Sequence, residues 1–206
     1  MLYTISRFIG YYLYRPFFVK EIKGMENIPK EGCIIASNHV SYLDPPILGF
    51  AVSQKLNKKV HYLAKIELFR HFFSRAVHKS LEAIPIDREK KDKSWIKTAK
   101  KYIRNGHIVG IFPEGGRSGT GKLQKGKTGA VRLALATKAP IVPVGIKGTY
   151  DLWPINKKFP KLKKIVRISI GKPVYYSRYY KKRITKSLLR RLTDDLMSEI
   201  DKLTVK

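Results

Sequence analysis

Residues 33–46 read CIIASNHVSYLDPP, so that an apolar run leads into a polar segment and then into two prolines. The run Cys33–Ser37 has the length and apolar character of a strand buried on both faces, as in the sheets of α/β proteins. Pro45 and Pro46 favour the backbone of a first helical turn, and we expect this helix to reach about Ser53. The stretch therefore predicts a buried strand, a loop with polar side chains and a helix.

The rest of the chain alternates between the same two patterns. Short segments with apolar and β-branched residues predict strands at Val19–Lys23, Val60–Ala64, Ala83–Ile86, Ile108–Phe112, Ile141–Ile146 and Val166–Ile170. Helical spacing of apolar residues predicts helices at Leu68–Val77, Asp92–Arg104, Gly126–Lys138 and about Thr185–Leu203. We therefore expect an α/β fold, a single domain with a mostly parallel or mixed central sheet flanked by helices. The basic loop Pro154–Lys164 is interpreted as an excursion rather than a domain boundary.

Charge limits the partners of this chain. The formal net charge is +28, and fourteen lysines and arginines but no acidic residue lie between Leu152 and Thr193. Such a field attracts nucleic acid, anionic lipid headgroups, or an acidic carrier protein or cofactor. The sequence has no zinc-finger spacing, aromatic RNA-binding motif or P-loop, so nucleic acid is not expected as a partner. The lone Cys33 cannot form an internal disulfide, which indicates a reducing compartment.

The N-terminal segment is rich in aromatic and aliphatic residues, but Arg7 and Arg15 interrupt it. Its longest uncharged internal stretch, Phe8–Tyr14, is too short to span a bilayer, and no signal-peptide cleavage site follows. We expect residues 1–18 to form an amphipathic helix in the membrane interface, broken or kinked at Pro16, and residues 19–206 to form the main domain. The alternative is a helix packed on the protein's own core.

His39 and Asp44 could act together on a substrate hydroxyl. A histidine titrates near neutral pH and can accept the hydroxyl proton, while a carboxylate on its other ring nitrogen fixes the tautomer. The sequence has no Gly-x-Ser-x-Gly motif, so we expect direct attack by the substrate hydroxyl without a covalent intermediate. The alternative is a structural histidine at a helix start. No third metal ligand lies at a recognisable spacing, so no metal is expected.

A second polar constellation, Phe112–Ser118, follows another predicted strand. Gly115 and Gly116 allow a sharp turn and a close approach to a ligand, and Arg117 can bind a phosphate with two parallel hydrogen bonds. Glu114 can bind a hydroxyl group or orient the arginine. The alternative is an ordinary turn with a solvated pair of charges.

Weaker candidates for phosphate binding are cations that follow strands or begin a helix. They are Arg88, Lys65 and, around Gly126, the three lysines Lys122, Lys125 and Lys127. A helix start favours a phosphate because its free N–H groups and its dipole both attract an anion. The alternative for each is a solvated side chain, which is the usual state of a lysine.

Taken together, these segments resemble the glycerolipid acyltransferases, specifically the 1-acyl-glycerol-3-phosphate acyltransferases. The family block Asn-His-x-Ser-x-x-Asp is matched at Asn38–Asp44, and the block Phe-Pro-Glu-Gly-Thr-Arg-Ser at Phe112–Ser118. Ile84–Arg88 resembles the second block of the family and ends in its arginine, and Ile141–Val144 resembles the fourth. The four blocks keep the family's order over roughly residues 20 to 150.

The resemblance implies a glycerol-3-phosphate acyltransferase-like fold that transfers a fatty acyl group to lysophosphatidate, giving phosphatidate in phospholipid biosynthesis. It implies His39 as the general base, Asp44 as its partner, and Glu114, Arg117 and Arg88 as contacts to the glycerol phosphate. The implied donor is an acyl thioester of acyl carrier protein or coenzyme A, with no further cofactor. The implied location is the cytoplasmic face of the cell membrane.

Two departures from the family pattern affect these expectations. Gly116 replaces the usual threonine, and the short N-terminal segment has no room for a transmembrane hairpin, which favours peripheral attachment. Alternative functions are acylation of glycerol 3-phosphate or of another lysophospholipid. A non-enzymatic module that binds anionic membranes is a third interpretation.

Overall fold

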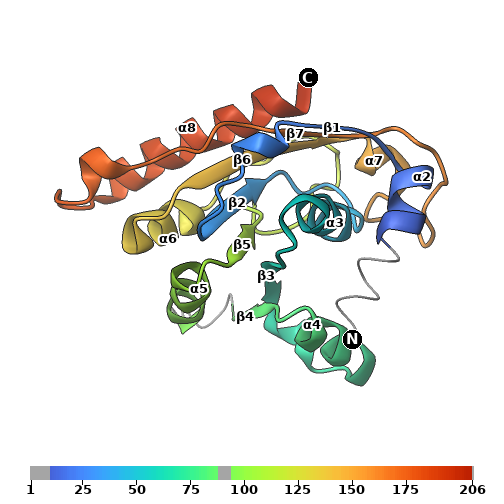
Figure 1. Ribbon diagram of the computed structural model, residues 1–206, viewed down its shortest axis with the longest axis horizontal. Helices are drawn as coiled ribbons and strands as arrows, with labels where there is room; N and C mark the ends of the chain where they lie inside the picture. Colours follow the sequence, from blue (N-terminus) through green and yellow to red (C-terminus); the bar gives the residue numbers. More distant parts are fainter. Residues whose placement is uncertain (1–9, 88–93, 206) are drawn as a thin grey trace.

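In the computed structural model, which describes residues 10–87 and 94–205, one mixed sheet carries helices on both faces (Figure 1). Its strands are β1 (Val19–Lys23), β2 (Cys33–Ser37), β3 (Val60–Lys65), β4 (Ile84–Ile86), β5 (Ile108–Ile111), β6 (Ile141–Lys147) and β7 (Val166–Ile170). Their order across the sheet is β1-β7-β6-β2-β5-β3-β4. Only β6 and β7 pair antiparallel among these neighbours. The predicted α/β fold with a mixed sheet is confirmed.

The helices cover the sheet in two layers. They are α2 (Arg15–Phe17), α3 (Asp44–Leu56), α4 (Phe72–Ser80), α5 (Ser94–Arg104), α6 (Gly129–Thr137), α7 (Thr149–Leu152) and α8 (Lys186–Val205). Shorter π or 3-10 turns are η1 (Gly10–Tyr14), η2 (Met25–Asn27), η3 (Ile66–Phe69) and η4 (Ser177–Tyr179). Buried residues of α5, α6 and α8 form the core on one face of the sheet, and those of α3 form the core on the other.

β2 lies in the middle of the sheet, between β5 and β6, and all of its residues are buried. Ile34 points into the core beneath α5, α6 and α8, whereas Ile35 points into the core beneath α3. Each contributes about 1.5–3 kcal/mol of burial free energy relative to an exposed side chain. The strand is apolar throughout because both of its faces are covered.

Helix α7 was not predicted, and α6 begins at Gly129 rather than at the predicted Gly126. Two further segments differ from the sequence-based prediction. The predicted helix Leu68–Val77 is instead η3 followed by α4, because the chain breaks at His71, whose backbone is extended. Residues 1–9 of the predicted interfacial helix lie outside the described residues. The remainder passes from η1 to α2, and Pro16 lies in the first turn of α2, where a missing N–H is tolerated. Within the described ranges, no helix has the length and apolar character required to cross a bilayer.

The reversal of direction between β6 and β7 determines what gathers at one edge of the sheet. The carboxyl ends of β2, β3, β5 and β6 share an edge because these strands are parallel. β7 runs the other way, and its Arg167 pairs with Lys147 at the end of β6. The segments that lead into β7 and into its parallel neighbour β1 therefore approach this same edge. Both polar constellations lie here.

Candidate active site

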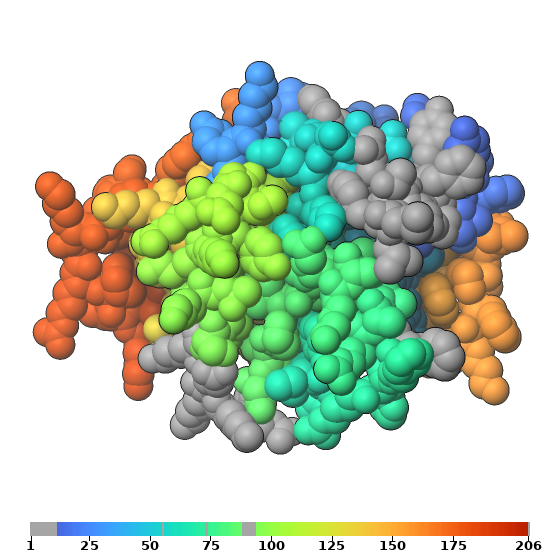
Figure 2. All heavy atoms as spheres, turned by 60° about the horizontal axis from the view of Figure 1, so that its bottom comes forward, coloured from blue at the N-terminus to red at the C-terminus, as the bar shows by residue number. Residues whose placement is uncertain are grey.

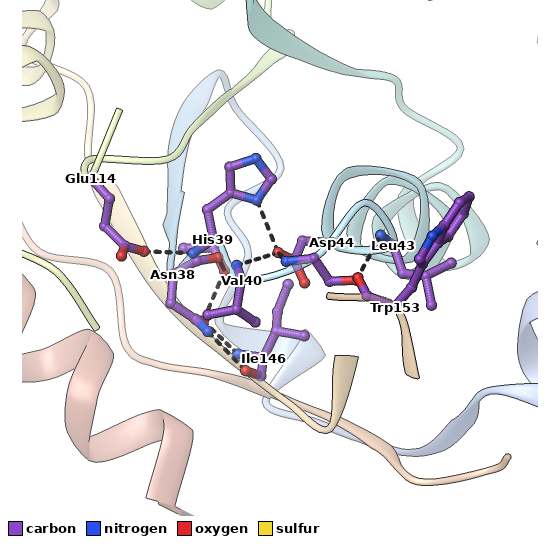
Figure 3. Close-up of polar contacts among 10 residues, drawn as sticks. Asn38, His39, Val40, Leu43, Asp44, Glu114, Ile146 and Trp153 are labelled. Atoms are coloured by element: carbon purple, nitrogen blue, oxygen red, sulfur yellow. Dashed lines mark hydrogen bonds and ion pairs between the residues drawn. The ribbon is translucent and has the colours of Figure 1, made fainter. Parts of the chain in front are cut away.

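His39 follows β2 and contacts Asp44 at the start of α3. The His39 Nδ1 atom lies 2.9 Å from Asp44 Oδ2 (Figure 3). The Asp44 side chain is fully buried, and the side chain of His39 is 16% exposed. Since an ionised carboxylate can only accept hydrogen bonds, the proton of the neutral ring lies on Nδ1, which leaves the Nε2 lone pair free for a substrate proton.

The backbone between the two residues holds the carboxylate in place. The N–H groups of Val40 and Ser41 each donate to Asp44 Oδ2 at 2.7 Å. Asp44 also lies in the first turn of α3, where the helix dipole stabilises a negative charge. These donors fix the position of the carboxylate beside Nδ1, so Asp44 can stabilise a protonated His39.

Asn38 fastens the start of this loop to the sheet. Its side-chain amide donates to the carbonyl of Ile146 at 2.9 Å and accepts from the Ile146 N–H at 2.8 Å. This pair continues the contact between β2 and β6 by one residue beyond the strand (Figure 3). The residues before and after His39 are therefore both held in place, Asn38 by Ile146 and Val40 by Asp44.

The Phe112–Ser118 turn packs directly against His39. The rings of His39 and Phe112 stack with centroids 4.0 Å apart, and the Ser118 N–H donates to the His39 carbonyl at 2.8 Å. Gly115 has φ +77°, a backbone conformation that side chains other than glycine disfavour. The two constellations therefore form one structure, although His39 and Glu114 lie 75 residues apart in the chain.

Glu114 joins the two constellations through backbone atoms. Its Oε1 accepts the His39 N–H at 2.6 Å, and its Oε2 accepts the Gln124 N–H at 2.9 Å. The residue is 5% exposed. Burial raises the pKa of this carboxyl group to about 7, against the opposing effect of the two N–H donors. The geometry gives Glu114 the role of holding the His39 backbone in place, a contact that sequence reasoning did not foresee.

Arg117 lies on an aromatic support. Its guanidinium carbon is 3.6 Å from the centroid of the Tyr42 ring, and Tyr42 contacts Trp153 at 5.2 Å between ring centroids. The Ser41 hydroxyl donates to the Trp153 carbonyl at 2.7 Å, which holds Trp153 beside the loop that carries Tyr42. A guanidinium stacked by one face keeps its N–H donors available at its edge, where a phosphate could bind.

A cavity of ≈ 190 Å³ opens beside His39. Its walls are mostly apolar, and they come from strands β3, β4 and β5, helices α5 and α6, and the glycine turn. The lining residues are His39, Leu63, Ile86, Trp95, Ile111, Phe112, Pro113, Gly115, Gly116, Lys127, Gly129 and Ala130. His39 and the turn that carries Arg117 therefore both line one largely apolar cavity.

Comparison with known proteins identifies the family. The acyltransferase family model matches residues 20–147, which include both constellations. This chain belongs to the acyltransferase family. The 1-acyl-sn-glycerol-3-phosphate acyltransferase of Bacillus subtilis is 36% identical to it over 156 residues, or 75% of this chain and 73% of the relative. The chloroplastic enzyme BAT2 of Brassica napus is 29% identical over 79% of this chain, but only 47% of that longer protein is covered.

The fold of a solved relative agrees with this assignment. The crystal structure of the 1-acyl-sn-glycerophosphate acyltransferase PlsC from Thermotoga maritima has a TM-score of 0.74 and 26% identity. The match covers 98% of this chain and 80% of that chain. The family and the fold implied by the sequence resemblance are confirmed.

Not all of the cations that we predicted to bind phosphate lie at the active site of this acyltransferase. Lys65 pairs with Glu67 at 3.2 Å, and neither Lys65 nor Lys125 lines the cavity. Lys125 instead lies in the segment next to α8, where the carbonyl of the following residue, Gly126, accepts a hydrogen bond from Arg190 at 2.7 Å. Arg88 lies outside the described residues.

Lys127, rather than Lys125, contributes a cation to the cavity of the acyltransferase. A Cβ atom placed on Gly115 would lie 2.9 Å from the Lys127 Nζ atom, so the lysine covers the glycine turn. The sequence placed both lysines in one cluster, and only the course of the turn distinguishes them. In the described part of the chain, histidine, cysteine and carboxylate side chains form no group of three that could bind a metal.

Proposed function

We propose that this acyltransferase transfers a fatty acyl group from an acyl thioester to the free hydroxyl of lysophosphatidate, giving phosphatidate. The observation that carries the proposal is the position of His39, whose ring is held by Asp44 and lines an apolar cavity. Such a histidine combines a base with space for an acyl chain. The acceptor named for the Bacillus subtilis relative supports the choice of substrate.

The proposed reaction uses one proton carrier. His39 Nε2 removes the proton from the acceptor hydroxyl. At the same time the hydroxyl oxygen attacks the carbonyl carbon of the thioester, and the new C–O bond forms. The C–S bond then breaks, and the imidazolium returns its proton to the leaving thiolate. Asp44 stabilises the imidazolium between these steps through its 2.9 Å contact with Nδ1. No atom of the enzyme is acylated.

We assign the acyl chain of the donor and the phosphate of the acceptor to two different parts of the site. We place the acyl chain in the cavity, whose aliphatic and aromatic walls can cover an alkyl chain. We place the acceptor phosphate at Arg117, whose guanidinium is supported by Tyr42. His39 and the turn that carries Arg117 both border the cavity, so the acyl carbon and the hydroxyl would meet beside His39.

The donor is proposed to be an acyl thioester of acyl carrier protein or coenzyme A. Both carry negative charge, which suits a chain with a net charge of +28. We also propose peripheral attachment to the cytoplasmic face of the membrane through the segment 1–18. The side chains of Tyr12, Leu13 and Phe17 in its described part are 59%, 40% and 46% exposed, which leaves apolar surface for lipid.

The test is an acyl-transfer assay with both donors on lipid vesicles, comparing the parent protein with His39→Ala. Turnover with lysophosphatidate that is lost in the variant supports the proposal. Turnover only with glycerol 3-phosphate or another lysophospholipid would keep the mechanism and replace the acceptor. Vesicle binding without turnover on any acceptor would favour the non-enzymatic membrane-binding alternative.

A further inference from the structure

The loop 154–164, which connects α7 to β7, mixes positive charge with exposed apolar side chains. It carries five lysines and no acidic residue: Lys157, Lys158, Lys161, Lys163 and Lys164. Among them, Phe159 is 81% exposed, Leu162 is 68% exposed and Ile155 is 43% exposed. Apolar side chains that gather among polar ones on an exposed surface are typical of a site that binds a protein or a membrane.

Hydrogen bonds hold the base of this loop. The Trp153 indole N–H donates to the Lys157 carbonyl at 3.0 Å, and the Lys161 N–H donates to the Leu152 carbonyl at 2.9 Å. Leu152 is itself buried in the core beneath the sheet. The loop is therefore anchored at its base, and its tip presents Phe159 outward.

The loop lies at the same edge of the sheet as the active site. It leads into Val166, and β7 begins opposite the end of β6, where Lys147 pairs with Arg167. The active site lies at the carboxyl ends of β2 and β6, which the hydrogen bonds between Asn38 and Ile146 join. In Figure 1 the loop projects at the end of the molecule that also carries α2 and α7.

A short series of contacts joins the loop to the proposed phosphate site. Arg117 lies over Tyr42, Tyr42 contacts Trp153, and Trp153 donates to the carbonyl of Lys157. The loop therefore begins beside the aromatic support of Arg117. A surface bound by the loop would lie next to the place where the acceptor phosphate is proposed to bind.

The loop also adjoins the described end of the N-terminal segment. The Val166 N–H donates to the Phe18 carbonyl at 2.8 Å, and β1 and β7 start side by side with Val19 paired to Val166. Phe17, the last residue of α2, is 46% exposed. Figure 2 shows the loop, in orange, at the right-hand rim of the molecule. Two segments with exposed aromatic residues thus approach one edge.

We propose that loop 154–164 binds the surface of an anionic bilayer, with Phe159 and Leu162 inserted among the lipids and the lysines on their phosphates. This inference deepens the proposed function, because it places the acceptor site against the membrane that would supply a lipid acceptor. Alternating lysines and apolar residues suit the bilayer interface, where each lysine near an anionic surface strengthens binding about fivefold. An acidic protein partner fits less well, since lysine is depleted from protein interfaces.

The test measures binding of the full chain to vesicles of phosphatidylcholine with and without phosphatidylglycerol. Phe159→Ser/Leu162→Ser removes the apolar tip, and Lys158→Ser/Lys163→Ser removes charge from the loop. Tyr175→Ser/Ile184→Ser and Lys181→Ser/Lys182→Ser are matched controls in the segment between β7 and α8, which follows the opposite end of β7. All eight side chains are exposed, so none of the variants creates a cavity in the core.

We expect the apolar loop variant to weaken binding to anionic vesicles about tenfold or more, which corresponds to partial burial of the two side chains. The charge variant should lose most of the dependence on phosphatidylglycerol, and both controls should bind like the parent. Equal binding by loop variants and controls would overturn the inference. So would a loop variant that binds vesicles normally and loses activity only with acyl carrier protein as donor, because the loop would then be a protein contact.

The binding assay and the activity assay separate this inference from the proposed function. With a short-chain lysophosphatidate that is monomeric in solution, the apolar loop variant should keep the turnover of the parent, whereas turnover on vesicles should fall with the binding. If the parent has no acyl-transfer activity and the loop variant still loses vesicle binding, the loop inference stands and the proposed function fails. Acyl-transfer activity with no effect of the loop on binding or on vesicle turnover would support the proposed function and overturn the loop inference.

Discussion

The backbone N–H of His39 donates a 2.6 Å hydrogen bond to Glu114 Oε1, so the motif that supplies the proposed base is fixed by the motif that supplies Arg117. The other carboxylate oxygen accepts the Gln124 N–H. Because both of its carboxylate oxygens accept hydrogen bonds from the backbone, Glu114 positions the neighbouring segments. This role differs from the contact with the glycerol phosphate that the sequence resemblance implied for Glu114.

Glu114→Gln should lower kcat and leave the acceptor KM little changed. The glutamine has one acceptor oxygen, so one of the two backbone donors loses its partner, at a cost of about 1–3 kcal/mol in the free energy of unfolding. Steady-state kinetics and urea unfolding measure the two effects. A rise in acceptor KM with unchanged stability would instead place Glu114 in contact with the substrate.

His39→Gln should reduce kcat by about 10²–10⁴, the usual contribution of a general base, while the protein remains folded. The fold should persist because His39 follows β2 and is partly exposed, so few core contacts depend on it. Far-UV circular dichroism and thermal unfolding provide the folding check, and His71→Gln at an exposed position is the matched control. Turnover equal to that of the parent would exclude His39 as the base.

Arg117→Ala should raise the apparent KM for lysophosphatidate at least about tenfold, which is the loss of a charged hydrogen bond. Arg117→Lys should have an intermediate effect, because an ammonium group retains the charge but not the two parallel donors. The KM for the acyl donor serves as the internal control and should change little. Equal increases in both KM values would count against a phosphate site at Arg117.

Gly115→Ala and Gly116→Ala should differ in stability although they are neighbours. Gly115 has φ +77° and Lys127 lies against it, so a side chain there should cost about 1–2 kcal/mol in the free energy of unfolding. A Cβ atom on Gly116 meets no heavy atom within 4 Å, which also explains how the family's threonine can be accommodated at this position. Denaturant unfolding of both variants provides the comparison, and equal stabilities would contradict the described turn.

His61 should make stability depend on pH. It is fully buried and stacks on Tyr102, and burial lowers its pKa below the ordinary value of 6.5, against the opposing effect of its contact with Glu82. The unfolded chain therefore binds more protons than the folded one below about pH 6.5, so stability falls as the pH falls through this region.

His61→Phe keeps a stacked ring and removes this titration. Relative to the variant, the parent should lose free energy of unfolding between pH 8 and pH 5, as measured by urea unfolding. The contribution of Glu114 is common to both proteins and cancels in the difference. A difference between the two proteins that is constant with pH would show that His61 has no perturbed titration.

Much of the fold follows from local sequence. The strands Val19–Lys23, Cys33–Ser37 and Val166–Ile170 have the predicted bounds, because their β-branched residues favour an extended backbone and a glycine or asparagine follows each strand. The error over Leu68–Val77 arose because the aromatic residues there fit helical spacing on both sides of the break at His71. Apolar spacing does not reveal a backbone that becomes extended for one residue.

The sequence by itself determined the strand–loop–helix unit around His39 and the five-residue spacing that brings its ring to Asp44, because both depend on neighbours along the chain. Only the tertiary structure decided that Glu114 binds the His39 backbone and that Lys127 rather than Lys125 lines the cavity. It also decided that loop 154–164 reaches the edge of the site, since this follows from the antiparallel pairing of β6 with β7. Contacts between distant segments depend on strand order and direction, which local preferences leave open.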